Sequence, residues 1–129
     1  MTLDELMFFD GWPRLLPIYA ALTDALNARW PDVRPKVCKT QISLYNRHLF
    51  AAASLPVHRG RNWPREFLLV TFGLPYRLES PRIAAASEPC PNRWTHHVCV
   101  TAPEGIDAEL LGWLDEAYQF ALARSARTH

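Results

Sequence analysis

The sequence predicts an α+β fold, in which N-terminal helices and a C-terminal helix pack on one face of a mostly antiparallel sheet of four to five strands. Apolar residues recur at helical spacing near both ends of the chain and alternate with polar residues through its middle. The chain of 129 residues is also too short for two ordinary domains. We therefore expect a single domain that spans residues 1–129.

Three helices are predicted from capping signals and helical spacing. Thr2 and Glu5 have the form of a capping box, which predicts a short helix over residues 3–8. A second helix is expected from Arg14 to Trp30, and a third after Asp107. The expected inward-facing residues are Leu15, Ile18, Tyr19, Leu22 and Leu26 in the second helix, and Leu110, Leu114, Ala117, Tyr118 and Ala121 in the third.

Four segments have the pattern of strands. Along residues 33–45 two sets of side chains alternate between the two sides of an expected strand. A turn at 46–48 joins this strand to a second one at 49–55, so a hairpin is predicted. Residues 66–72, Glu-Phe-Leu-Leu-Val-Thr-Phe, have apolar side chains on both faces of the expected strand, which is typical of a strand covered on both sides. Residues 94–101 alternate again, with His96 and His97 on opposite sides of the strand.

The segment between the last two strands is rich in proline. Ser80 as an N-cap and Pro81 at the first helical position predict a short helix over 81–87. The two long helices can cover only one face of the sheet, yet the 66–72 strand has apolar side chains for both. We therefore expect the 74–93 segment, a second copy of the protein or a ligand to cover the second face, which is where a pocket or a dimer contact is predicted.

Composition narrows the classes of function. A net charge of +1 argues against a globally basic nucleic-acid-binding protein. Residues 29–65 contain eight Lys or Arg residues and a single acid, Asp32. Within this basic segment, residues 58–63 combine arginines with an indole that could stack on a base. A solvent-exposed rim of the hairpin explains the positive charge better than a nucleic-acid contact does. No apolar run reaches membrane-spanning length, the N-terminus is acidic rather than signal-like, and three cysteines lack CxxC spacing, so we expect a cytoplasmic protein without membrane association.

Catalytic and metal signals are weak. Cys90, His96, His97 and Cys99 suggest zinc, but no two cysteines have the spacing of a zinc knuckle, so we expect no metal and no cofactor. The chain has no GxSxG, GxxxxGK[ST] or HExxH motif. His96 shares a strand side with apolar neighbours, which favours a core histidine over a general base.

The polar side of the 33–45 strand carries the strongest binding signal. Its polar residues recur at two-residue spacing, and polar residues of the 94–101 strand join them if the two strands lie close together. The candidate ligand-binding residues are Lys39, Gln41, Ser43, Arg93, Thr95 and His97. Cationic, amide and hydroxyl groups on a sheet floor suit a phosphate or a carboxylate. The alternative is an ordinary strand that is polar because it faces solvent.

Two segments of the predicted strands have distinctive sequences: residues 36–43 read Lys-Val-Cys-Lys-Thr-Gln-Ile-Ser, and residues 93–98 read Arg-Trp-Thr-His-His-Val. They resemble the two signature stretches of the domain of unknown function 5655 family. The resemblance implies a small bacterial domain with a compact α+β fold, similar to the YdhG-like domains, and no established activity. It draws attention to Lys39, Thr40, Ser43, Arg93, Trp94 and His96. Leu44 stands where the family has an aromatic residue, and His97 where it has a basic one.

Three classes of function follow, in this order. A binding module for a small anionic ligand explains the polar stripe. A protein-interaction or homodimerisation domain explains the apolar 66–72 strand. A small enzyme that uses His96 or His97 as an acid–base is the third alternative, and it lacks an evident partner residue.

Overall fold

The structure is a computed structural model that describes residues 1–57 and 59–127. It contains three α-helices and six strands, so the α+β class and the arrangement of helices before and after the sheet are confirmed. The strands are β1 (Arg34–Val37), β2 (Gln41–Tyr45), β3 (Leu49–Ser54), β4 (Leu68–Leu74), β5 (Ala85–Cys90) and β6 (Arg93–Val100). They form one sheet in the order β1-β2-β3-β4-β6-β5, and every neighbouring pair is antiparallel.

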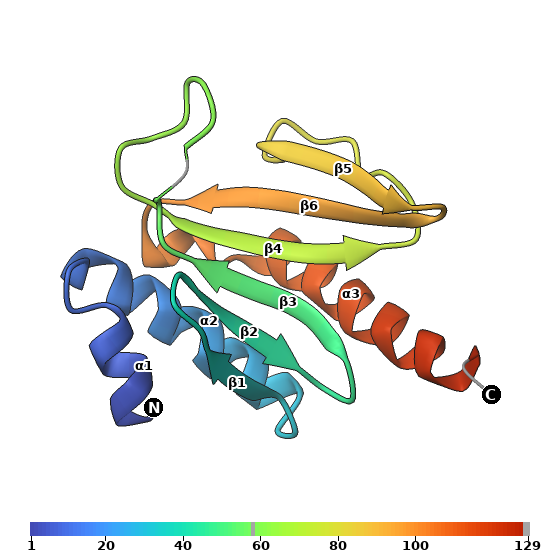
Figure 1. Cartoon of the computed structure of the whole chain (residues 1–129), viewed down its shortest axis with the longest axis horizontal. Coiled ribbons are helices and arrows are strands. Elements are labelled where there is room, and N and C mark those ends of the chain that lie inside the picture. The colour runs from blue at the N-terminus through green and yellow to red at the C-terminus, as the bar shows by residue number, and fades with distance from the viewer. Residues whose placement is uncertain (58, 128–129) are drawn as a thin grey trace.

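The two long helices, α2 (Leu16–Arg29) and α3 (Ala108–Arg127), lie on the same face of the sheet (Figure 1). All ten side chains predicted to face inward from these helical segments are buried. They pack against alternate residues of the central strands, among them Ile42, Ala53, Val70 and Val98, which stand in one register row across β2, β3, β4 and β6. The hydrophobic core therefore lies between the helices and this face of the sheet.

Helix α1 (Leu3–Phe8) begins at the predicted capping box. The Thr2 hydroxyl accepts from the Glu5 amide (3.2 Å), and the Glu5 carboxylate accepts from the Thr2 amide (2.8 Å). The other Glu5 oxygen accepts a hydrogen bond from the Tyr19 hydroxyl, which is fully buried in α2. Burial alone would raise the pKa of Glu5, but the bonds from Thr2 and Tyr19 outweigh it and lower that pKa. The capping carboxylate thereby ties α1 to the core.

The prediction of one strand over 33–45 is wrong, because these residues form a hairpin of β1 and β2. The chain reverses at 38–40, where the Cys38 amide donates to the Gln41 carbonyl oxygen (2.8 Å). A hairpin keeps the two-residue alternation on both of its strands, so the pattern did not show the reversal. No glycine, proline or asparagine stands at 38–40 to mark a turn. Lys39 and Thr40 consequently lie in the turn and not on a strand.

The predicted helix over 81–87 is also wrong. Ser80 forms a single turn, in which its hydroxyl accepts from the Arg82 amide (3.2 Å) and its carbonyl from the Ile83 amide (3.1 Å). The chain then becomes β5, which pairs with β6 through partners such as Ala85 and His97. Backbone hydrogen bonds to the otherwise unpaired edge of β6 outweigh the helix propensity of the alanines.

Strand β4 is covered by helices on one side only. Its alternate residues Leu68, Val70, Phe72 and Leu74 are buried in the core, whereas the residues between them are half-buried on the opposite side. The expectation of a strand that is apolar on both sides is therefore wrong within β4. The apolar run included Phe67, which lies before β4 and is buried with the indole of Trp63 edge-on against it (ring centroids 5.7 Å).

We call the sheet face opposite the helices the open face. Alternation and register assign to it Arg34, Lys36, Gln41, Ser43, Tyr45, Ala52, Ser54, Leu69, Thr71, Gly73, Arg93, Thr95, His97 and Cys99. The connection between β3 and β4 projects beyond one end of the sheet (Figure 1). The 74–93 segment does not cover this face, because Leu78 and Ile83 pack against the core on the helix side and β5 extends the sheet edge.

Candidate ligand site on the open face of the sheet

The open face has an uneven charge. Strands β1–β4 and β6, all of them within the described chain, contain no Asp or Glu, whereas Arg34, Lys36 and Arg93 are exposed on this face. A terminal guanidinium nitrogen of Arg34 donates to the Asn46 carbonyl oxygen (2.8 Å). Among the described residues, no carboxylate pairs with Lys36 or Arg93. Strands β1–β4 and β6 therefore present positive charge on the open face without an acid of their own, and the acid of the edge strand β5, Glu88, accepts a hydrogen bond from the Asn92 amide (3.0 Å).

A cavity of about 320 Å³ opens where the pairing of β3 with β4 ends. The last partners in that direction are Ala51 and Phe72, and no ladder partner joins the residues beyond them across this pair. The lining residues are Gln41, Leu49, Phe50, Ala51, Ala52, Thr71, Phe72, Gly73, Thr95, Ala117, Phe120 and Ala121. Because residues of the open face and of α3 both line it, the cavity leads from the open face between the two strands toward α3.

Three uncharged polar side chains line the open-face side of the cavity. The Gln41 amide nitrogen donates to the Ser43 hydroxyl oxygen (2.9 Å), which holds the amide over the sheet. The Thr71 hydroxyl lies 2.8 Å from Nδ1 of His97. Thr95 is half-buried, and its hydroxyl makes no side-chain bond to any described residue. This mouth therefore offers hydroxyl and amide groups for hydrogen bonds to a ligand.

The end of the cavity toward α3 is apolar, and a β-bulge contributes an aromatic ring to it, whereas a glycine leaves space on the open-face side. Leu44 is opposite Ala51 but the next residue, Tyr45, is opposite Leu49, so Phe50 is the extra residue of the bulge. The Phe50 ring belongs to the core and packs edge-on to Tyr118 of α3 (5.3 Å). A Cβ at Gly73 would meet only the Trp94 carbonyl oxygen, at 3.9 Å, so the glycine leaves room at the cavity that a side chain would fill.

The structure brings four of the six predicted ligand residues to one region. Gln41 and Thr95 line the cavity, and Ser43 and His97 each contact a lining residue. Strands β3 and β4 separate β2 from β6, so Ser43 and His97 stand three strand spacings apart, or about 14 Å. The small side chains of Ala52 and Thr71 lie between them in the same register row. The polar residues thus line a floor and do not converge on one point.

The two predicted cations lie at opposite ends of the sheet. Arg93 is two residues from Thr95 on the same face, at the start of β6. Lys39 is in the turn just before Gln41, and Gln41 is in the same register row as Cys99. Cys99 is six residues from Arg93 along β6. Six strand residues span about 20 Å. One small ligand can contact Arg93 or Lys39 but not both, and Lys36 is the cation beside Ser43, its direct β1 partner.

Burial changes the titration of two open-face groups. Desolvation lowers the pKa of His97, so its ring is neutral at pH 7. Nδ1 of this neutral ring forms a hydrogen bond with the Thr71 hydroxyl. Desolvation raises the pKa of the Cys99 thiol, which keeps it protonated and unreactive. Both groups therefore act as neutral polar surface under physiological conditions.

His96 is a core residue, as the sequence favoured. Its side chain is fully buried on the helix side, stacked on Phe72 (5.3 Å), and its Nε2 accepts a hydrogen bond from the Leu78 amide (2.9 Å). Burial lowers the pKa of His96, which favours the neutral ring. No Asp, Glu or Cys contacts the ring among the described residues, so this histidine has neither solvent access nor a catalytic partner.

The remaining sequence signals lie away from the cavity. Trp94 is on the helix side, with the Arg77 guanidinium 5.7 Å from its ring centroid. Cys38 and Cys90 are exposed, and no group of three or more metal-ligating side chains occurs in the described part of the chain. In the basic loop, Arg59 donates to the Pro64 carbonyl oxygen (3.4 Å), whereas His58 lies outside the described residues. Every described helix is too short or too polar to cross a bilayer.

The sequence interpretation missed Thr71, Gly73 and the α3 residues of the cavity. A threonine and a glycine within the otherwise apolar 67–74 run were the available signal, because both types are unusual where a strand is covered on both sides. Ala117 and Ala121 were predicted only as core residues of the last helix. Their place in a cavity depends on the separation of β3 from β4, which no local pattern encodes.

The fold and the site define a small α+β domain with a six-stranded antiparallel sheet, two long helices on one face and a cavity that opens on the other. The family model described as Domain of unknown function (DUF5655) matches residues 8–121, and the chain belongs to that family. The match confirms the resemblance seen in the two signature segments. Neither the curated proteins nor the solved structures gave a match.

Proposed function

We propose that this domain is a binding module that holds a small anionic ligand in the cavity on the open face of the sheet. The observation that carries the proposal is the combination of a cavity with a hydroxyl- and amide-lined mouth and a sheet face without carboxylates on β1–β4 and β6. An anion entering this mouth meets hydrogen-bond donors and a nearby cation, and no acid of these strands repels it.

The residues have distinct roles in this proposal. Thr95 of β6 and the Gln41 amide of β2 donate to the ligand, and the Thr71 hydroxyl of β4 donates when Nδ1 of His97 carries the proton of the bond between them. Arg93, two residues from Thr95 on the same face, supplies a positive charge at the entrance. The cavity volume is at the lower end of the range for small-molecule sites. The ligand is accordingly small.

The test is a thermal-shift screen with inorganic phosphate, phenyl phosphate, acetate, benzoate, hexanoate and uncharged benzyl alcohol. A ligand at a hundred times its dissociation constant stabilises the fold by about 2.7 kcal/mol. For a domain of this size that is a rise in Tm of about 10 °C. We expect at least one anion to raise the Tm and benzyl alcohol to have less effect. If none of the anions changes the Tm, the proposed function is wrong.

Two matched variants link any binding to this cavity. Gly73→Val puts a side chain into the cavity at a position whose Cβ is free of close contacts, so we expect folding to persist and binding to be lost. Ala85→Val adds the same branched carbon to an exposed β5 position outside the cavity lining and should bind as the native chain does. Equal loss in both variants would place the ligand elsewhere.

A protein-interaction or homodimerisation domain is the second candidate, and one observation favours it. The sheet has two free edges, and Arg34, Pro35 and Lys36 protect the β1 edge with charge and proline. The β5 edge ends with Glu88 and Pro89 but begins with small uncharged residues at 85–87, and this first part has a form that can accept another strand. Sedimentation measurements at micromolar concentration test this candidate: a dimer that Ala85→Pro converts to a monomer supports it, because the Ala84 amide faces β6 and the next amide faces the free edge, and a monomeric native chain rejects the homodimer.

A further inference from the structure

We propose that the ligand of this cavity is a small monocarboxylate with an apolar body, bound with its carboxylate at the mouth and its body toward α3. The inference rests on the proposed function and names the class of anion. It follows from the opposite polarity of the two ends of one cavity: hydroxyl and amide groups lie at the open face, and aromatic and methyl groups lie at the helix.

The apolar end requires a ligand with an apolar part. Eight of the twelve lining residues contribute hydrocarbon or aromatic surface: Ala52 and the exposed Leu49 at the open face, and Phe50, Ala51, Phe72, Ala117, Phe120 and Ala121 toward α3. A ligand such as acetate or inorganic phosphate fills only the mouth and leaves this surface in contact with water. Apolar burial contributes about 25 cal/mol for each Å² removed from water, so a ring or a short chain that reaches α3 binds more tightly than the bare anion.

The polar end selects a carboxylate over a phosphate ester. None of the lining residues is charged, and Arg93 is the nearest cation that the register places beside the lining. A phosphate monoester has close to two charges at neutral pH and loses more hydration on entering a site with uncharged donors. Phosphate sites typically use several cations or the amides of a helix N-terminus. Helix α3 instead contributes Ala117, Phe120 and Ala121, which lie well away from its N-terminus.

The size of the cavity limits the body of the ligand. A dry cavity of about 150 Å³ in a protein interior accommodates benzene. The cavity here is about twice that volume, which is enough for one ring or a chain of about six carbons together with a carboxylate. A nucleotide combines a base, a sugar and a phosphate and exceeds this space. Benzoate and hexanoate are therefore suitable probes.

The experiment is calorimetric titration of the full chain with benzoate, hexanoate, acetate and phenyl phosphate. We expect benzoate or hexanoate to bind at least tenfold more tightly than acetate, and benzoate at least tenfold more tightly than phenyl phosphate, which has the same ring. Arg93→Gln should weaken benzoate binding severalfold, and Arg14→Gln, which removes an exposed arginine just before α2 and away from the cavity lining, should leave it unchanged.

The outcomes separate this inference from the proposed function. If phenyl phosphate binds as tightly as benzoate or more tightly, or if acetate equals hexanoate, the carboxylate inference is overturned while an anion-binding module stands. If neither phosphates nor carboxylates bind, both are overturned. Gly73→Val provides the structural check, because loss of benzoate binding in a variant that retains the native Tm supports the cavity, and undiminished binding refutes it.

Discussion

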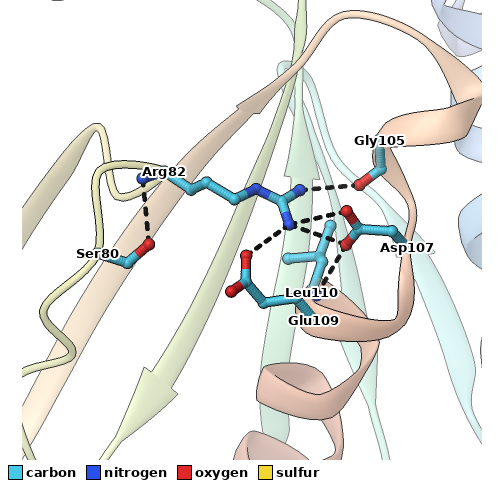
Figure 2. Close-up of polar contacts among 6 residues, drawn as sticks. All are labelled: Ser80, Arg82, Gly105, Asp107, Glu109 and Leu110. Atoms are coloured by element: carbon cyan, nitrogen blue, oxygen red, sulfur yellow. Dashed lines mark hydrogen bonds and ion pairs between the residues drawn. The ribbon is translucent and has the colours of Figure 1, made fainter.

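Arg82 joins the connection between β4 and β5 to the start of α3, and replacing it with alanine should destabilise the domain. Figure 2 shows its guanidinium between the loop and the helix. One terminal nitrogen of the guanidinium donates to both Asp107 oxygens (2.8 and 3.0 Å) and to Glu109 (2.9 Å), and the other donates to the Gly105 carbonyl oxygen (3.0 Å). The guanidinium carbon also lies 5.7 Å from the ring centroid of Trp113.

The expected loss of stability in Arg82→Ala depends on how far the interacting groups are exposed to solvent. The Arg82 side chain is 28% exposed, but those of Asp107 and Glu109 are 45% and 54% exposed, so each ion pair contributes only about 0.5 kcal/mol. The charged bond to the Gly105 carbonyl contributes about 1 kcal/mol, and the contact with Trp113 about 0.5 kcal/mol. We therefore expect Arg82→Ala to lower the free energy of unfolding by about 2–3 kcal/mol, equivalent to about 8–12 °C in Tm.

Urea denaturation and thermal melting of the Arg82→Ala variant measure this loss. Arg47→Ala removes an exposed arginine without a described ion pair and should change the free energy of unfolding by less than about 0.5 kcal/mol. Adding 1 M salt should reduce the ion-pair part of the difference, because the Debye length falls to about 3 Å. A loss of less than 0.5 kcal/mol for Arg82→Ala would show that the contacts in Figure 2 do not stabilise the domain.

Two further predictions concern buried polar groups. Because burial lowers the pKa of both His96 and His97 below the ordinary 6.5, the unfolded chain takes up protons first as the pH falls below 6.5. The free energy of unfolding should be greatest above this pH and fall below it by at most about 1.4 kcal/mol per pH unit for each histidine. In the His96→Phe variant, urea denaturation at several pH values should show a smaller dependence of the free energy of unfolding on pH. An unchanged dependence would contradict the role of the buried, neutral His96. Tyr19→Phe removes a buried donor to the Glu5 carboxylate and should cost about 2 kcal/mol at pH 7 in the same assay, whereas a neutral effect would mean that water replaces the hydroxyl.

Local signals in the sequence predicted the helices and the strand β6 well. The capping box at Thr2 and the helical spacing from Leu15 and Leu110 are properties of neighbouring residues, because a cap or a helical stripe involves positions three or four apart. The alternation around His96 likewise predicted which side of β6 is buried. These elements needed no information about distant parts of the chain.

The errors lie where distant backbone decides the structure. The alanines after Pro81 have high helix propensity, but they form β5 because the edge of β6 offers them hydrogen-bond partners. The reversal at Lys39 is invisible to a pattern that repeats every two residues in either direction. The candidate site was only partly predictable for the same reason. Alternation assigned Gln41, Ser43 and Thr95 to sides of their strands, but it did not show which of these residues are neighbours in space.

The sequence by itself determined the α+β class, the family and the long helices. These properties depend on neighbouring residues or on composition, so they can be predicted without knowing the order of the strands in the sheet. Only the tertiary structure decided that Lys39 and Arg93 lie at opposite ends of the sheet, and that β3 parts from β4 above α3 to open the cavity. Strand order, a bulge at Phe50 and the direction of a helix are set by long-range packing, which no short segment of the chain contains.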